Sequence, residues 1–175
     1  MTLFVFRGDT RLREAALTGE ATAPREFLWG LDLALEKHDG VDAIIAKRGV
    51  RRGLNKFFFI PDKLLANALG LGLPLEIVAQ NFLAFREARH ILTVNDQASL
   101  SLLFWKLARF LPNSQVHVVI MSLPERLRRY KPPPAVRRLV NRLLKKADSI
   151  ITLSEVLARA ISDAFPEAPP AQVVH

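Results

Sequence analysis

Short apolar runs alternate along this chain with longer segments in which apolar residues recur at intervals of three and four. The short runs are rich in β-branched and aromatic residues and too short to form helices, which is typical of buried strands. We predict strands at residues 3–6, 41–46, 57–60, 91–94, 115–121 and 149–153, and the start of a further strand at 171–174.

The longer segments have the spacing of helices. In the first of them, Leu28, Leu31 and Leu35 follow Pro24, a residue favoured in the first helical turn. The segment 97–111 is apolar nearly all round, so we expect its helix to be buried. Helices are predicted at about 24–38, at 62–88 in two pieces, and at 97–111, 134–146 and 154–165, with a basic, proline-bearing connection at 122–133.

Strands separated by helices specify an α/β fold with a mostly parallel sheet. We therefore expect a Rossmann-like three-layer α/β/α sandwich with about six strands. Residues 1–175 suit a single domain of this kind. Such sheets bind ligands at the carboxyl ends of their strands. The residues predicted to lie there are Arg7, Gly8, Lys47, Arg48, Asn95, Asp96, Ser122 and Ser154.

The composition excludes several kinds of chemistry. The chain has no cysteine, which removes disulfides, thiolate metal sites and a cysteine nucleophile. Its four histidines are dispersed and show no metal-ligand spacing, so we expect neither a metal nor another cofactor. The glycine-rich and serine motifs of hydrolases, nucleotide triphosphatases and classical dehydrogenases are also missing.

The pattern also argues against insertion into a membrane. A helix needs a run of roughly 18 apolar residues to span a bilayer, and the sequence contains no such run. Arg7 interrupts the N-terminal apolar run too early for a signal peptide. We therefore expect a cytoplasmic protein.

The positive charge is concentrated in one place. The chain carries 25 Lys and Arg against 17 Asp and Glu, a net charge of +8. Between Arg126 and Lys146 there are nine basic residues and no acidic one, and the rest of the chain is close to neutral. The residues predicted to contact an anion or a membrane are Arg128, Arg129, Arg137, Arg138, Arg142, Lys145 and Lys146.

Three interpretations of the basic helix at 134–146 remain open. Val136, Leu139, Val140, Leu143 and Leu144 share one helical face, so the helix either packs on the core with a solvated basic face or docks on an anionic membrane. Nucleic-acid binding is the weakest interpretation, because it usually combines basic residues with several aromatic stacking residues. The segment from 126 to 146 has one aromatic residue, a tyrosine.

Two further groups have both a binding and a structural interpretation. Asn95 and Asp96 could orient substrate hydroxyl groups, or could act only as a helix N-cap. A second basic cluster follows the strand at 41–46 and is either a phosphate or carboxylate clamp or a solvated loop. It contains Lys47, Arg48, Arg51 and Arg52.

The segment 147–157, with the sequence Ala-Asp-Ser-Ile-Ile-Thr-Leu-Ser-Glu-Val-Leu, resembles a known family. It is similar to the strand-to-helix run in the N-terminal domain of GT-B fold glycosyltransferases of the family-four, or group 1, type. Residues 88–96 are similar to the fourth strand of that domain, and residues 116–121 occupy the place of its next strand. The order and spacing of elements agree over nearly the whole chain.

This resemblance implies the N-terminal half of a retaining enzyme that needs no obligatory metal. In the family, the N-terminal domain binds a sugar or lipid acceptor, and a C-terminal domain binds the nucleotide-sugar donor. The chain stops near His175, where the donor domain should begin, so we expect little transferase activity from it alone. The resemblance places Asn95, Asp96 and Ser122 in the acceptor cleft.

The loop facing the donor domain would hold Arg7, Gly8 and Gly19. The chain departs from the family at two points. Ala23 and Pro24 replace the usual glycine pair, and the segment from Met121 to Pro124 lacks the histidine that often follows the fifth strand.

A lipid acceptor would account for the basic helix, which would then dock at the inner membrane face. The rival hypothesis is a non-catalytic α/β module that docks on an anionic membrane or a partner subunit.

Overall fold

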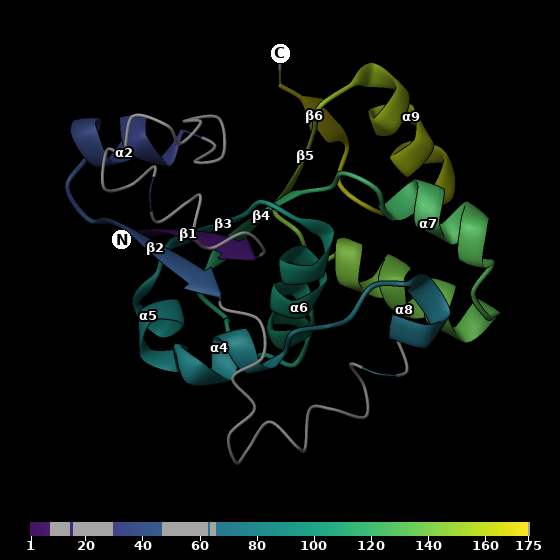
Figure 1. Ribbon diagram of the computed structural model, residues 1–175, viewed down its shortest axis with the longest axis horizontal. Coiled ribbons are helices and arrows are strands. Elements are labelled where there is room, and N and C mark those ends of the chain that lie inside the picture. Colours follow the sequence, from purple (N-terminus) through teal and green to yellow (C-terminus); the bar gives the residue numbers. More distant parts are fainter. Residues whose placement is uncertain (8–14, 16–29, 47–62, 64–65, 175) are drawn as a thin grey trace.

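The computed structural model describes residues 1–7, 15, 30–46, 63 and 66–174 (Figure 1). Within these ranges, all the strands are parallel and form one sheet in the order β2-β1-β3-β4-β5-β6. The strands are β1 (Thr2–Arg7), β2 (Val41–Ala46), β3 (His90–Thr93), β4 (Gln115–Val119), β5 (Ser149–Thr152) and β6 (Ala171–Val173).

Helices flank this sheet on both faces, which gives the expected Rossmann-like α/β architecture. Leu3 and Val5 of β1 point into the larger core, which α4 to α9 cover. Phe4 and Phe6 point to the other face, where Leu31 of α2 packs on them. The helices are α2 (Leu31–Lys37), α4 (Glu76–Gln80), α5 (Phe82–Glu87), α6 (Asp96–Leu107), α7 (Leu123–Tyr130), α8 (Pro134–Leu144) and α9 (Glu155–Ala164).

Most of the predicted elements that fall in the described ranges are confirmed. Six of the seven predicted strand segments form the sheet, including 171–174, which contributes β6. The strand predicted at 57–60 and the first part of the helix predicted at 24–38 lie outside the described residues. The helices predicted at 97–111 and 134–146 end earlier, at Leu107 and Leu144.

The connection predicted at 122–133 contains a helix, α7, that the sequence pattern did not reveal. Pro124 lies in the first turn of α7. Backbone N–H groups have no partner within the helix there, so the missing N–H of proline costs no hydrogen bond. The helix ends at Lys131, which has a left-handed backbone with φ 43°. With only eight residues, α7 offers few apolar positions from which to recognise its period.

The strand order changes direction between β1 and β3, because β2 lies on one side of β1 and β3 on the other. At such a switch point the loops that follow two neighbouring strands leave in opposite directions and open a crevice at the carboxyl edge. Val94 directly follows β3 and donates a backbone hydrogen bond to Val5 O at 3.3 Å. The residues that follow Val94 therefore begin at this carboxyl edge.

Gly70 has a left-handed backbone conformation that residues with a Cβ atom rarely adopt. Its φ is +62°, and a Cβ atom added there would lie 2.5 Å from Cζ of Tyr130. Its carbonyl oxygen accepts a hydrogen bond of 2.9 Å from Nη1 of Arg126. Gly70 thus fixes the segment before α4 against α7.

We predict that Gly70→Ala lowers the free energy of unfolding more than Gly30→Ala does. Both glycines are left-handed, so each alanine costs about 1–2 kcal/mol of backbone strain. Gly30 has no atom within 4 Å of an added Cβ, whereas at Gly70 the ring of Tyr130 must also move. Urea unfolding measures the difference, which should disappear in a Tyr130→Ala background. Equal losses for the two single variants would contradict this account.

Candidate functional site

A pocket lies at the carboxyl ends of β4 and β5, between the turns that follow these strands. Its volume is about 760 Å³. We call it the strand-end pocket. Met121, Leu153 and Val156 give it an exposed apolar border, and the exposed fraction of Val156 reaches 78%. The lining residues are Met121, Pro124, Glu125, Arg128, Arg129, Leu153, Ser154, Val156, Leu157 and Ala160.

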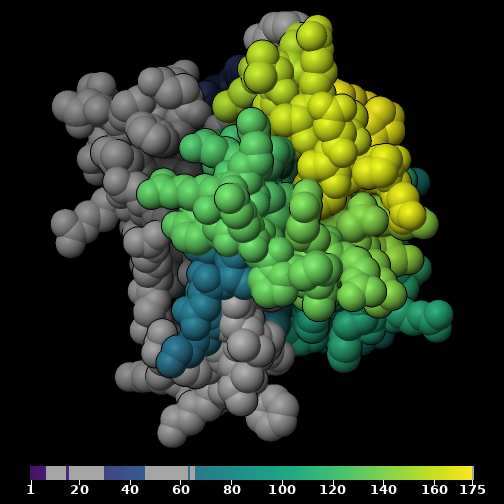
Figure 2. Space-filling view, turned by 90° about the vertical axis from the view of Figure 1, so that its right-hand side faces the viewer, coloured from purple at the N-terminus to yellow at the C-terminus, as the bar shows by residue number. Residues whose placement is uncertain are grey.

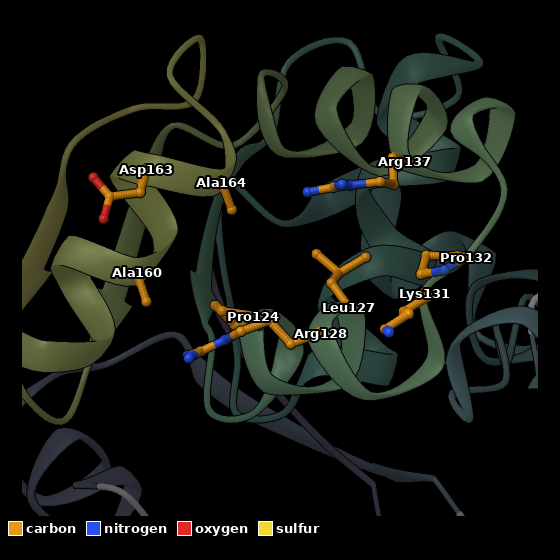
Figure 3. Close-up of a pocket in the computed structure, with 9 residues that line it drawn as sticks. All are labelled: Pro124, Leu127, Arg128, Lys131, Pro132, Arg137, Ala160, Asp163 and Ala164. Atoms are coloured by element: carbon orange, nitrogen blue, oxygen red, sulfur yellow. The ribbon is translucent and has the colours of Figure 1, made fainter.

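A second hollow, the interhelix groove, adjoins the first and has a volume of about 710 Å³. It runs between α7, α8 and α9, which lie together on one face of the molecule (Figure 2). Leu127 and Arg137 extend from α7 and α8 toward the space between the helices (Figure 3). The groove is lined by Pro124, Leu127, Arg128, Lys131, Pro132, Arg137, Ala160, Asp163 and Ala164.

The carboxylate of Asp96 holds the turn that leads into α7. Asp96 is only 4% exposed, and its carboxylate accepts three hydrogen bonds from the chain. Met121 N donates to Oδ1 at 2.8 Å, and Ser122 donates to Oδ2 from its backbone N at 2.9 Å and from Oγ at 2.6 Å. Nε of Arg126 then donates to Ser122 Oγ at 3.0 Å. This network satisfies a buried carboxylate within the fold.

Asn95 and Ser154 both act as helix N-caps. Oδ1 of Asn95 accepts from Ala98 N at 2.8 Å at the start of α6. Oγ of Ser154 accepts from Leu157 N at 3.3 Å at the start of α9, and Ser154 is exposed and borders the strand-end pocket. The structure therefore brings Asp96 and Ser122 together. Asn95, next to Asp96 in sequence, serves as a cap, and Ser154 is open to solvent.

The other predicted site residues divide into three groups. Arg7 ends β1, at the carboxyl edge of the sheet. Gly8, Gly19, Lys47, Arg48, Arg51 and Arg52 lie outside the described residues. The predicted basic residues of α7 and α8 are exposed, namely Arg128, Arg129, Arg137, Arg138 and Arg142, whereas Arg126 is partly buried. Those that line the pockets are Arg128, Arg129 and Arg137.

The sequence patterns did not place Lys131, Leu127 or Asp163 in a site, yet these residues line the interhelix groove. The spacing of Leu123 and Leu127, four residues apart, was the available signal for α7. Asp163 carries no local signal, because α9 brings it to the groove through tertiary packing.

The apolar side of α8 is used by the core. Val140, Leu143 and Leu144 are fully buried, and Val136 and Leu139 pack against them. The helix therefore presents only its charged side to solvent. On or beside that side stand Arg137, Arg138, Arg142, Lys145 and Lys146, of which Lys145 forms an exposed ion pair of 3.3 Å with Glu167.

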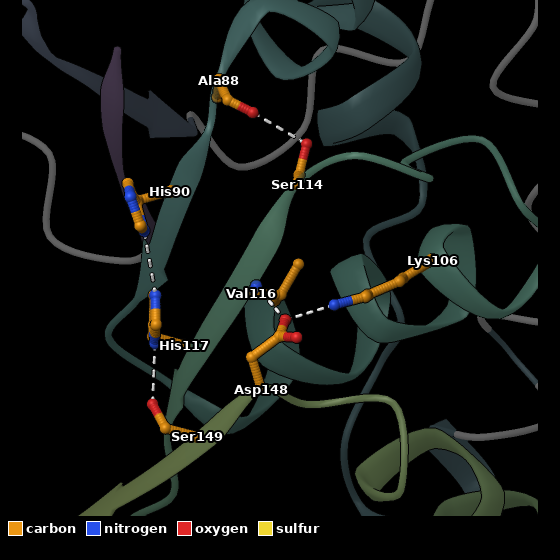
Figure 4. A network of polar contacts seen from close by, with 8 residues as sticks. All are labelled: Ala88, His90, Lys106, Ser114, Val116, His117, Asp148 and Ser149. Carbon is orange, nitrogen blue, oxygen red and sulfur yellow. Dashed lines mark hydrogen bonds and ion pairs between the residues drawn. The ribbon is translucent and has the colours of Figure 1, made fainter.

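A separate polar network crosses the amino-terminal ends of β3, β4 and β5 (Figure 4). His90 Nδ1 lies 3.4 Å from His117 Nε2, and the two rings stack with centroids 5.7 Å apart. His117 Nδ1 lies 2.8 Å from Ser149 Oγ. Asp148 accepts hydrogen bonds from Lys106 and from Val116 N.

The surroundings of this network shift two pKa values. Burial lowers the pKa of His117 from its ordinary 6.5, and the charges of His90 and Lys106 lower it further, against the opposing effect of Asp148. Burial alone would raise the pKa of Asp148, but the hydrogen bond from Lys106 leads the effects that bring it below 3.8. The network lies at the edge of the sheet opposite the two pockets, so we assign it a structural role.

The described residues form neither a metal cluster nor a membrane-spanning helix. Within them, no group of three or more His, Asp or Glu side chains could hold a metal ion. No helix in the described ranges is both long and apolar enough to cross a membrane. The arrangement that remains is a pair of adjacent hollows with basic and apolar walls.

No protein-family model, curated protein or solved structure matches this chain significantly. The resemblance to glycosyltransferases therefore stays a prediction from the sequence.

We predict that the free energy of unfolding falls as the pH drops below about 6.5. The folded protein keeps His117 neutral to a lower pH than the unfolded chain does, so the unfolded chain binds more protons in this range. Urea unfolding at pH 7.5 and 5.5 should show a smaller decrease for His117→Gln than for wild type. His38→Gln, at an exposed position after α2, is the matched control and should behave as wild type does. An unchanged decrease in His117→Gln would contradict the prediction.

Proposed function

We propose that this chain is the acceptor-binding domain of a retaining GT-B glycosyltransferase of the family-four type, which transfers sugar from a nucleotide-sugar donor held by a second domain. One observation carries the proposal. The segment 147–157, which bears the family resemblance, forms β5 and the start of α9, and its second half borders the strand-end pocket. The contributing residues are Leu153, Ser154, Val156 and Leu157.

The fold supports the same assignment. The parallel sheet offers its ligand sites along the carboxyl ends of the strands. The strand-end pocket lies at this edge, beside β4 and β5 and next to the switch point between β1 and β3. The pocket combines apolar residues with polar groups that can bond hydroxyls, such as Ser154 and the carboxylate of Glu125. This combination suits a sugar that carries an apolar group, since the two parts need different partners.

The geometry changes the roles of the predicted acceptor residues. Asp96 already accepts three hydrogen bonds from the chain itself, so in this proposal it positions the turn after β4 rather than the acceptor. Ser122 likewise acts through that turn. Direct contacts with acceptor hydroxyls then come from Ser154 and Glu125, which border the pocket.

The proposal predicts that octyl glycosides bind in the strand-end pocket. Backbone amide NMR signals of residues 121–125 and 153–157 should shift on titration with octyl glucoside below its micelle concentration. Val156→Asp should weaken this binding about tenfold, because it places a charge on an apolar contact surface. Leu83→Asp is the control, since Leu83 is also an exposed apolar helix residue, 71% exposed, and lies on α5 away from the pocket. Equal losses in both variants, or no shift of these amides, would argue against an acceptor site.

A second candidate function, docking on an anionic membrane, is supported by the one-sided charge of α8. Arg138 and Arg142 are exposed and have no ion-pair partner among the described residues. Because the apolar side of α8 is buried, the attraction would be electrostatic and would not involve insertion of the helix. Each basic residue near an anionic leaflet is worth about 1 kcal/mol.

For this candidate we expect co-sedimentation with vesicles of phosphatidylcholine and phosphatidylserine, and none with phosphatidylcholine alone. The triple variant Arg137→Glu, Arg138→Glu, Arg142→Glu should lose most of the binding, because three attractions become repulsions. Raising the salt concentration should weaken wild-type binding as well. Equal sedimentation of wild type and variant would exclude membrane docking through this face.

A further inference from the structure

Three cationic side chains line the interhelix groove, and none of them has a partner among the described residues. Arg128 and Lys131 come from α7 and its end, and Arg137 comes from α8. None of the three side chains forms an ion pair or hydrogen bond within the part of the chain that the structure describes. Asp163 is the acidic residue of the lining, and its carboxylate points away from the centre of the groove (Figure 3). The groove therefore has an excess of positive charge.

The backbone at the end of α7 holds Lys131 in an unfavourable conformation. Its φ of 43° is left-handed, which is uncommon for a residue with a side chain and is typically filled by glycine or asparagine. Pro132, Pro133 and Pro134 follow directly, and proline fixes its own φ and restricts the residue before it. The turn between α7 and α8 is thus stiff, and it carries a lysine where glycine would relieve the strain.

Apolar side chains complete the groove. Leu127 and Pro124 of α7 face Ala160 and Ala164 of α9, so the small alanines leave space between the two helices. Leu127 is 5% exposed and belongs to the core, which makes this wall rigid. A ligand in the groove would meet positive charge and an apolar surface together.

We propose that the interhelix groove binds a phosphate ester, with its phosphoryl group held by Arg128, Lys131 and Arg137 and its organic part against Leu127 and the alanines of α9. Arginine and lysine are the side chains that pair most strongly with phosphate oxygens. All three line the same groove and come from two helices joined by a stiff turn, so a ligand in the groove lies within reach of cationic side chains from both helices. This inference does not depend on the glycosyltransferase assignment, since it uses neither the strand-end pocket nor the resemblance.

The groove can be separated experimentally from the general charge of α8. Arg137 lines the groove, whereas its neighbour Arg138 is equally basic and exposed but does not. Calorimetric titration with dihexanoyl phosphatidic acid, below its micelle concentration, should show binding to the wild-type protein. Arg137→Gln should weaken it about tenfold, the loss of one charge-assisted contact, and Arg138→Gln less than twofold. Equal effects of the two variants would overturn the proposal.

Lys131→Gly provides a second test, because stability and affinity should change in opposite directions only if Lys131 contacts the ligand. Glycine relieves the left-handed strain, so the melting temperature should rise while the affinity for dihexanoyl phosphatidic acid falls several-fold. Unchanged affinity in this variant would also overturn the proposal.

The choice of probe distinguishes two sources of the ligand. Inorganic pyrophosphate shares the phosphoryl group and lacks the acyl chains. If it binds as tightly as the lipid and with the same dependence on Arg137, the ligand is a soluble phosphate. If the lipid binds at least tenfold more tightly, the ligand is a lipid headgroup and its chains contact the apolar wall. If neither probe binds, the groove is not a phosphate site.

Discussion

The buried carboxylate of Asp96 holds together the elements that form the two pockets. It begins α6 directly after β3 and accepts hydrogen bonds from the turn after β4, so it ties two neighbouring strand ends together. Ser122 extends this tie to Arg126, which bonds the carbonyl oxygen of Gly70. The direction of α7 depends on these contacts. Since α7 forms a wall of both pockets, the loss of this one carboxylate would loosen both.

The regular part of the fold could be predicted from the sequence because its signals are local. The runs at 91–94 and 149–153 are bounded by turns and read directly as strands. The function of Asp96 could not be predicted in the same way, because its partners lie 25 and 26 residues away and a cap explained it equally well. The helix α7 was missed because Pro124 and the charged residues outnumber its apolar positions.

Tertiary packing decides between two interpretations of the apolar face of α8. The sequence left open whether the apolar face of α8 meets the core or a membrane, and the buried Val140, Leu143 and Leu144 settle that it meets the core. The positive side that remains is not uniform. Arg137 turns toward a hollow with an apolar wall, while Arg138 does not line it. Concentrated like charge destabilises a compact fold by repulsion, and a bound anion would relieve this.

All the strands in the described part of the chain run parallel, which separates two regions of this protein that can vary. Every strand begins at one edge of the sheet and ends at the other, so the stacked pair His90 and His117 is separated by the length of the strands from Ser122 and Ser154. Sites this far apart without shared partners usually contribute additively to stability. Substitutions that change the pH dependence of stability at one edge can therefore accumulate without altering the pockets at the other, so the two regions can change independently in evolution and in engineering.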